Sequence, residues 1–292
     1  MAFMMGETRP RKLPAGWYPR SAGGVLEAVE EFEIRAEQFE HAGAAAAVVV
    51  PHAGWTFSGA LAYAALRALP QRVRCVVVVG GHLRPGDPVL VAPEDRFETP
   101  LGSLAAATEL RTEVRRRLEC RDDRDTDNSV EVQLPLVKRL FPETEVLYLR
   151  APPDKQAIEL AETLAELDRA RDGGLVVVGS TDLTHYGPNF GFTSHGSASQ
   201  AIDWVKGEND RRAIDPLLRL EPQLAIDQAL RYRAACSMGA GACAAQFGRL
   251  RGAGVARLIG HYTSFDLIGG DTIVGYAGIT FEYEVEPPER PA

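Results

Sequence analysis

Three of the six histidines come a few residues after an apolar, strand-like segment of the chain. The apolar runs occupy residues 44–50, 73–79 and 175–178, and the histidines that follow them are His52, His82 and His185. In an open α/β sheet the functional crevice lies beyond the carboxyl ends of the strands. If these strands are parallel neighbours, the three imidazoles gather at one edge. Each histidine alone could equally be a buried residue with one hydrogen bond, so their shared position is what indicates a metal or acid–base site.

One cysteine could complete such a metal site. Cys236 stands in YRAACSMGAGACAA, where the small residues indicate the start of a helix, and a helix N-terminus favours the thiolate that binds metals. The alternative is a small buried side chain, which is what we expect of Cys75 and Cys243. Cys120 falls in a charged loop. With no Cys-x-x-Cys pair, the sequence indicates neither a zinc ribbon nor a thioredoxin-type centre.

Apolar strands and amphipathic helices alternate along the first part of the chain, which predicts an α/β fold. The strands are near-continuous in Val, Leu and Ala, as in a sheet that is covered on both faces. We therefore expect a central mostly parallel or mixed sheet with helices on both faces. The predicted strands are 44–50, 73–79, 146–149 and 175–178, and the predicted helices between them are 58–69, 128–140 and 154–170.

Two further features refine this prediction. Asn128 and Glu131 have capping-box spacing at the start of the second helix, and Pro135 inside it predicts a kink or an early end. After Gly187 the pattern becomes helical, and two strands close the chain. We find no internal repeat or long linker, so we expect a single domain over 1–292, with a frayed tail at about 286–292.

Composition excludes several classes of function. The 40 acidic residues outnumber the 32 Lys and Arg residues, for a formal net charge of −8, which disfavours nucleic acid as a partner. The basic cluster at 115–117 is flanked by acidic residues and predicts a solvated helix face. No apolar run reaches the roughly 18 residues needed to span a membrane, and no signal peptide is evident. The sequence therefore predicts a cytoplasmic protein with reduced cysteines and no membrane partner.

Several of these segments together resemble one known family. The motifs are LPAGWYP at 13–19, VVVPHAGWTFSGALA at 48–62, DNSVEVQLP at 127–135, GSTDLTHYG at 179–187 and ACSMGA at 235–240. Their order and spacing, over nearly the whole chain, are similar to those of the Memo family, also called AmmeMemoRadiSam system protein B. The resemblance implies a fold like that of the class III extradiol ring-cleaving dioxygenases.

The resemblance also implies a metal held by two histidines and a cysteine, which here map to His52, His82 and Cys236. Asp182 and His185 would lie beside it as orienting or acid–base groups. Three departures from the family pattern stand out. The loop Gly80-Gly81-His82 is one residue shorter than in the family, Asn128 replaces a histidine, and Ser237 replaces the glycine after the cysteine.

These residues suit oxygenase chemistry. Three protein ligands leave open positions on Fe(II) for a diol and O₂, and a neutral His185 could accept the proton of the diol. Trp17 and Tyr186 could wall an aromatic pocket, together with Asn128, or could be ordinary core residues. A thiolate ligand also suits Cu or Zn.

Two functions therefore stay open. One is a non-haem metal-dependent oxygenase acting on a small aromatic or diol-type molecule. The other is a non-catalytic metal- or peptide-binding protein that uses the same cleft. A zinc hydrolase is a third and more distant alternative. The expected partner is a small molecule, and association with another protein or as a homo-oligomer stays open.

Overall fold

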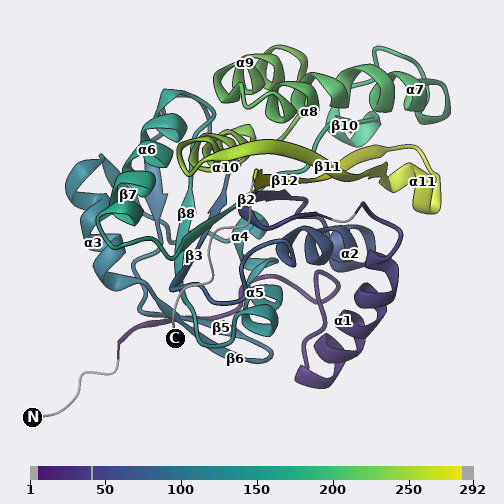
Figure 1. Ribbon diagram of the computed structural model, residues 1–292. Helices are drawn as coiled ribbons and strands as arrows, with labels where there is room; N and C mark the ends of the chain where they lie inside the picture. Colours follow the sequence, from purple (N-terminus) through teal and green to yellow (C-terminus); the bar gives the residue numbers. More distant parts are fainter. Residues whose placement is uncertain (1–5, 41, 285–292) are drawn as a thin grey trace, which may run out of the picture.

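The computed structural model describes residues 6–40 and 42–284, which form one α/β domain around a mixed sheet (Figure 1). The central strands lie in the spatial order β8, β3, β9, β2 and run parallel to one another. They are β8 (Glu145–Arg150), β3 (Cys75–Gly80), β9 (Leu175–Ser180) and β2 (Ala45–Val50). All four were predicted, and the mixed sheet confirms the expected fold class. The predicted tail at 286–292 lies outside the described residues.

The apolar character of these strands is explained by the two hydrophobic layers that they separate. Successive residues of β2 face opposite sides: Ala47 and Val49 pack in one layer, and Val48 and Val50 in the other. Helices pack on both faces and supply much of both layers (Figure 1). On the first side lie α3 (Thr108–Arg117), α6 (Lys155–Arg169), α8 (Asp210–Leu218), α9 (Pro222–Tyr232) and α10 (Met238–Leu250), and on the second lie α1 (Ala22–Ala36), α2 (Trp55–Leu66) and α5 (Leu134–Leu140).

The two predicted closing strands are β11 (Ala253–Thr263) and β12 (Ile273–Tyr283), which form a long antiparallel pair. β12 also pairs antiparallel with β2 and with the short β10 (His185–Tyr186). The helix α11 (Ser264–Ile268) between β11 and β12 was not predicted, because five residues are too few to establish a helical period. The hairpin thus extends the sheet on the side of β2, the strand that His52 follows in the chain.

The opposite end of the sheet consists of short strands that the sequence did not predict. They are β1 (Thr8–Arg9), β4 (Val89–Val91), β5 (Arg96–Thr99), β6 (Gly102–Ala106) and β7 (Cys120–Asp122). Cys120 therefore belongs to a strand and not to a loop. The basic cluster 115–117 ends α3 and pairs with partly or fully exposed acidic residues on α3, β7 and α6, which confirms the predicted solvated face.

The helix predicted over 128–140 is divided in two. α4 (Asn128–Glu131) ends before Gln133, and α5 begins at Leu134 with Pro135 in its first turn, where a proline is tolerated. The predicted capping box was wrong: Asp127 caps α4 by accepting from the Ser129 amide. The buried Glu131 carboxylate instead accepts from the Lys12 and Leu13 amides and from the Tyr18 hydroxyl. These hydrogen bonds hold the N-terminal segment against α4.

Other helices lie close to their predicted positions. α6 begins after its Asp154 cap, as predicted, and α2 begins three residues earlier than expected. The helical region after Gly187 contains the short 3₁₀ helix η1 (Pro188–Phe190), α7 (Ala198–Trp204), the π-helical turn η2 (Val205–Asn209), α8 and α9.

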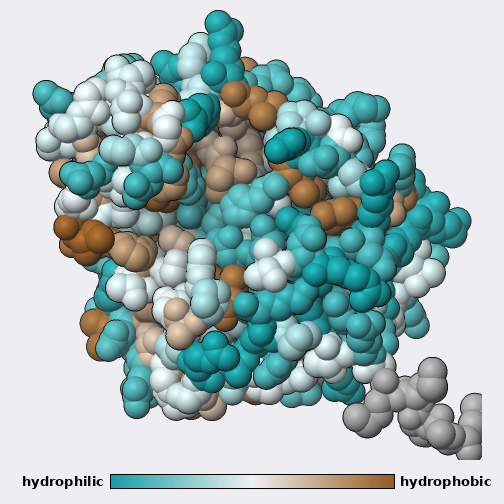
Figure 2. Space-filling model, turned by 180° about the vertical axis from the view of Figure 1, so that it is seen from behind, coloured by the Kyte–Doolittle hydropathy of each residue, from teal (hydrophilic) through white to brown (hydrophobic). Residues whose placement is uncertain are grey.

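The surface seen from the side opposite to Figure 1 is largely hydrophilic, and its hydrophobic groups lie in separate small patches (Figure 2). Within residues 6–40 and 42–284, no helix has both the length and the apolar character needed to cross a membrane. This agrees with the absence of a long apolar run in the sequence.

Candidate metal centre

The structure brings His52, His82 and Cys236 together. One donor atom from each lies within 4.8 Å of the other two. His52 lies two residues beyond β2, His82 two residues beyond β3, and Cys236 just before α10. The strand between β2 and β3 is β9, so the two imidazoles meet across its carboxyl end. Their rings are 4.9 Å apart between centroids and are inclined at 71°.

His52 is buried and is fixed from several sides. Its Nδ1 lies 3.3 Å from the Ser180 hydroxyl at the end of β9, and its backbone N–H donates to the Asp182 carboxylate at 2.6 Å. The Asn128 side chain donates to the His52 carbonyl at 2.9 Å. Since Nδ1 faces Ser180, Nε2 is the ring nitrogen that faces Cys236.

His82 reaches the centre through an unusual turn. Its φ is 58°, a left-handed conformation that is costly for a residue with a side chain and that occurs mainly where surrounding contacts enforce it. The Ser237 hydroxyl accepts from the His82 amide at 3.1 Å, and the Ser129 hydroxyl accepts from the Gly81 amide at 3.1 Å. A side chain at Gly81 would collide with Ser237. The shortened Gly80-Gly81-His82 loop thus still presents His82 to the centre.

The thiol of Cys236 completes the group. Its Sγ lies 3.2 Å from His52 Nε2, and its backbone N–H donates to the Asp182 carbonyl at 3.2 Å. Burial alone would raise the pKa of Cys236, but the charge and hydrogen bond of His52 and a hydrogen bond from His82 hold it well below its usual value. Burial likewise opposes protonation of His82, yet its bonds to Asp127 and Cys236 raise its pKa to about 10. Both pKa directions favour a thiolate beside a protonated imidazole when no metal is bound.

We expect Cys236 to be the most reactive cysteine of the metal-free protein towards iodoacetamide. A depressed pKa keeps the thiolate present as the pH falls, so its alkylation rate should change little between pH 8 and pH 6. An ordinary thiol, with a pKa of about 8.5, loses about tenfold per pH unit over that range. Burial raises the pKa of Cys120 to about 11 and raises those of Cys75 and Cys243 further.

Mass spectrometry of the labelled peptides, with a chelator present, measures the four rates separately. A Cys236 rate that drops tenfold per pH unit would contradict the thiolate. Added Zn(II) should protect Cys236 and leave the labelling of Cys120 unchanged, because only Cys236 belongs to the group.

A cavity of about 400 Å³ opens over His52 and His82. Its lining combines aromatic and aliphatic walls with a few polar groups, which is typical of small-molecule sites. Besides His52 and His82, the lining includes Trp17, Phe57, Asn128, Asp182, His185, Ser264, Ile268, Val274 and Tyr276. Trp17 and Asn128, two residues that the sequence offered as candidates for the pocket, are part of this lining.

Tyr186 does not line this cavity, so its assignment to the pocket was wrong. Its side chain is fully buried against Ala198, Ala201 and Ile273, and its hydroxyl donates to the Gly196 carbonyl at 2.9 Å. Its backbone pairs with β12 as part of a strand. Because successive side chains of a strand point to opposite faces, Tyr186 points into the core and the neighbouring His185 lines the cavity. The alternative interpretation of Tyr186 as a core residue is the one that the structure supports.

His185 and Asp182 lie on the loop that follows β9. His185 Nδ1 is 3.0 Å from the Leu183 carbonyl, which can only accept, so Nδ1 carries the proton and Nε2 is free. The ring packs edge-on against Phe190. Asp182 is buried, which raises its pKa, and its carboxylate contacts the His52 amide. Asp182 therefore orients the His52 loop, and the imidazole of His185 is oriented by a carbonyl.

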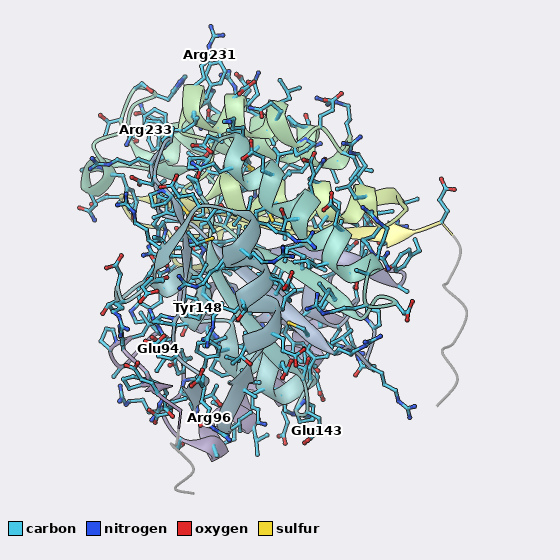
Figure 3. The ribbon with its side chains drawn as sticks, turned by 90° about the vertical axis from the view of Figure 1, so that its left-hand side faces the viewer. Glu94, Arg96, Glu143, Tyr148, Arg231 and Arg233 are labelled. Atoms are coloured by element: carbon cyan, nitrogen blue, oxygen red, sulfur yellow. The ribbon has the colours of Figure 1, made fainter. Side chains whose placement is uncertain are left out.

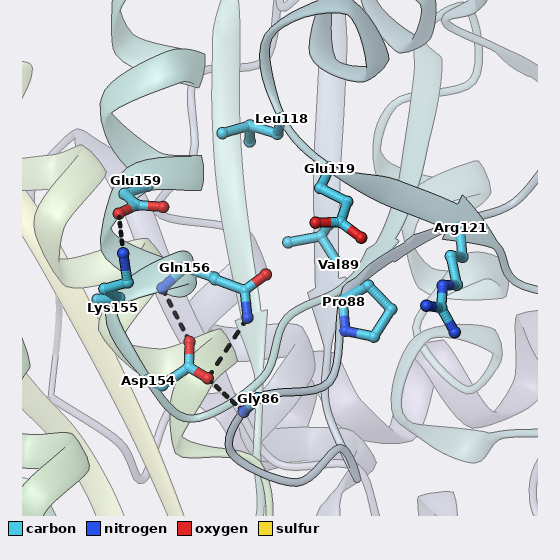
Figure 4. A pocket seen from close by; sticks show the side chains of 10 residues that line it. All are labelled: Gly86, Pro88, Val89, Leu118, Glu119, Arg121, Asp154, Lys155, Gln156 and Glu159. Atoms are coloured by element: carbon cyan, nitrogen blue, oxygen red, sulfur yellow. Dashed lines mark hydrogen bonds and ion pairs between the residues drawn. The ribbon is translucent and has the colours of Figure 1, made fainter.

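A larger hollow of about 600 Å³ lies elsewhere, between the 86–89 loop, the 118–121 segment and the start of α6 (Figure 4). Three of its charged groups have local contacts: Asp154 caps α6 and accepts from the Gly86 amide, and Lys155 pairs with Glu159. No group of potential metal ligands lies there among the described residues. The smaller cavity over His52 and His82 is the candidate site.

Sequence reasoning missed two residues that orient the histidines. Asp127 Oδ2 lies 2.8 Å from His82 Nδ1, and the Ser180 hydroxyl faces His52 Nδ1. Asp127 stands immediately before Asn128 in the motif DNSVEVQLP. Its position as a possible helix cap was the one signal in the sequence that could have drawn attention to it. Ser180 ends a uniformly buried strand and gave no signal.

These features define a single α/β domain with a His–His–Cys group that could hold a metal ion at the carboxyl edge of its parallel strands. A family model described as Memo-like protein matches residues 9–280. The chain belongs to the Memo family, as its motifs suggested.

Archaeal proteins are among the relatives. A MEMO1 family protein of Methanopyrus kandleri is 31% identical over 246 residues, which cover 80% of this chain and 82% of the relative. Those of Thermococcus onnurineus and Archaeoglobus fulgidus are 29% and 27% identical, covering 80% and 94% of this chain and 85% and 99% of the relatives. An uncharacterized protein from Escherichia coli K12, with a solved structure, aligns at a TM-score of 0.45 and 15% identity, covering 80% of this chain and 98% of that one.

Proposed function

We propose that this protein binds a divalent metal through His52, His82 and Cys236 and uses it as a non-haem oxidoreductase on a small aromatic or diol-type molecule. One observation carries the proposal: the three donor atoms converge within 4.8 Å, and two of the residues, His52 and His82, line a cavity of about 400 Å³. Metal bonds to imidazole nitrogen and thiolate are about 2.0–2.3 Å long, so an ion can lie among donors at this separation.

The donor set suits a metal in a further respect. Both histidines have Nδ1 engaged, His52 with Ser180 and His82 with Asp127, which leaves both Nε2 atoms as ligands. Such partners commonly fix the ring orientation of metal-binding histidines. Three protein ligands leave coordination positions open on the cavity side. We propose Fe(II) for the oxidoreductase, and the thiolate makes Zn(II) or copper the alternatives.

The residues of the cavity have roles that follow from their placement. A bound Fe(II) would supply the open positions and the redox chemistry that join a diol to dioxygen. His185, with Nδ1 held by the Leu183 carbonyl, would take the proton of a substrate hydroxyl at Nε2. Asp182 would keep the His52 loop in place. Trp17, Phe57 and Tyr276 would hold a flat ring and exclude water.

Oxygen consumption tests this function. The protein is loaded anaerobically with Fe(II) and mixed with aerated buffer and a panel of catechols, other diols and monophenols. We expect uptake that depends on a diol. The same protein loaded with Zn(II), which has no redox chemistry, is the matched control and should show none. Fe(II) bound at the site without uptake across the panel would contradict the oxidoreductase and favour a metal-binding protein without catalysis.

A further inference from the structure

We infer that Asp127 is a positioning residue for His82, and that Arg150 fixes Asp127 in turn from the protein interior. The inference rests on the proposed metal binding, because it assigns to Asp127 the orientation of one ligand. It adds two residues to the centre, neither of which the sequence motifs identified as part of it.

The contacts of Asp127 leave it little freedom. Oδ2 accepts from His82 Nδ1 at 2.8 Å and lies 3.3 Å from Arg150 Nη1. Oδ1 accepts from the Ser129 amide at 2.9 Å and from the Ser129 hydroxyl. Both oxygens are thus engaged, and the side chain is 8% exposed. A carboxylate held in this way presents a fixed acceptor to the imidazole, which leaves Nε2 of His82 directed away from Asp127.

Arg150 belongs to a buried chain of charges that reaches away from the centre. It pairs with Asp123 at 2.8 Å, and Asp123 lies 3.7 Å from Arg9, which pairs with Glu94 at 3.3 Å. The Arg9 guanidinium also stacks over the Tyr148 ring. Glu94 and Tyr148 lie in one region of the molecule, well away from Arg231 and Arg233 (Figure 3).

The buried charges of this chain leave a carboxylate beside His82. Two buried cations, Arg9 and Arg150, face three buried carboxylates, Glu94, Asp123 and Asp127. One negative charge is in excess, and Asp127 is the carboxylate that touches His82. In a buried setting an unbalanced charge is costly, and a cation next to it removes that cost. A cation at His82, either the protonated imidazole or a metal ion bound to its Nε2, would supply this balance.

Metal affinity of the full chain tests the inference. The probe is Co(II), followed through its thiolate charge-transfer absorption, with Zn(II) competition to obtain dissociation constants. Asp127→Asn keeps the shape and removes the charge, and we expect roughly tenfold weaker binding. Asp127→Ala also removes the hydrogen bond, and we expect metal binding up to about 100-fold weaker, which is within the range typical of such orienting partners. Asp122→Asn is the matched control, because Asp122 pairs with Arg115 and Arg124 at the surface, and its affinity should equal that of the wild type.

The His82→Ala background shows whether the effect passes through the imidazole. There, Asp127→Asn should weaken binding no further, and an equal loss in both backgrounds would overturn the inference. Wild-type affinity in Asp127→Asn itself would also overturn it.

A metal-independent readout separates this inference from the proposed function. In the NMR spectrum of the metal-free protein, the Nδ1 proton of His82 should exchange slowly in the wild type and rapidly in Asp127→Ala, which removes the acceptor. If the wild type binds no metal, the proposed function fails. Slow exchange in the wild type that becomes rapid in Asp127→Ala would still support the positioning role, and an exchange rate unaffected by the substitution would overturn it.

Discussion

Replacing Cys236 with serine should weaken binding of Zn(II) or Fe(II) by roughly 10²-fold or more. Apparent binding free energies of about 10–16 kcal/mol for four-ligand zinc sites correspond to about 2.5–4 kcal/mol per ligand, and each 1.4 kcal/mol is a factor of ten. The thiolate of Cys236 lies 3.2 Å from His52 Nε2, and a serine hydroxyl stays protonated at neutral pH and is a much poorer ligand. Competition with a chromophoric chelator measures the dissociation constant.

Two other cysteines provide matched controls for this substitution. Cys75 lies inside β3 and Cys243 inside α10, and both are buried among apolar side chains. Cys75→Ser and Cys243→Ser each place a hydroxyl in the core, so they should lower stability and leave the metal affinity of the folded protein unchanged. Equal metal affinity in all three variants would exclude Cys236 as a ligand.

The second large effect concerns turnover. His185→Ala should keep the metal and lower diol-dependent oxygen uptake by about 10²–10⁴-fold, the usual loss when a general acid–base group is removed. His185 lines the cavity with its Nε2 free, and it is not part of the three-residue ligand group. The assay is the oxygen uptake described above, together with the metal content of each preparation.

His195 offers the matched control for His185. It lies ten residues further along, is exposed and stacks on Trp204, away from the cavity lining. His195→Ala should therefore retain wild-type uptake. If His185→Ala also retains full uptake, His185 has no part in the reaction. If His185→Ala loses its metal instead, it acts in binding and not in proton transfer.

Local sequence patterns accounted for the central part of this fold. The four parallel strands are buried on both faces, so their apolar runs were unambiguous, and α6 carries both a clear amphipathic period and an Asp154 cap. The short outer strands β4 to β7 have mixed composition and are defined by pairing with distant segments. Such pairing leaves no local period in the sequence.

The candidate site divides in the same way. His52, His82 and Cys236 were found from strand-end position and motif resemblance, and they meet in the structure. Asp127 was missed because its role depends on a contact 45 residues away in the chain, at His82. Tyr186 was a candidate for the pocket or for the core, and it packs in the core because adjacent residues of a strand face opposite sides.

Metal stoichiometry tests the central claim most directly. The protein is purified anaerobically, incubated with Fe(II), Zn(II) or Cu(I), freed of unbound ions and analysed by inductively coupled plasma mass spectrometry. The His52–His82–Cys236 group predicts about one ion per chain for the wild type. It also predicts a large loss in the His52→Ala, His82→Ala and Cys236→Ser variants. The claim would be contradicted if the wild type retained none of the three metals. It would also be contradicted if the variants retained as much metal as the wild type.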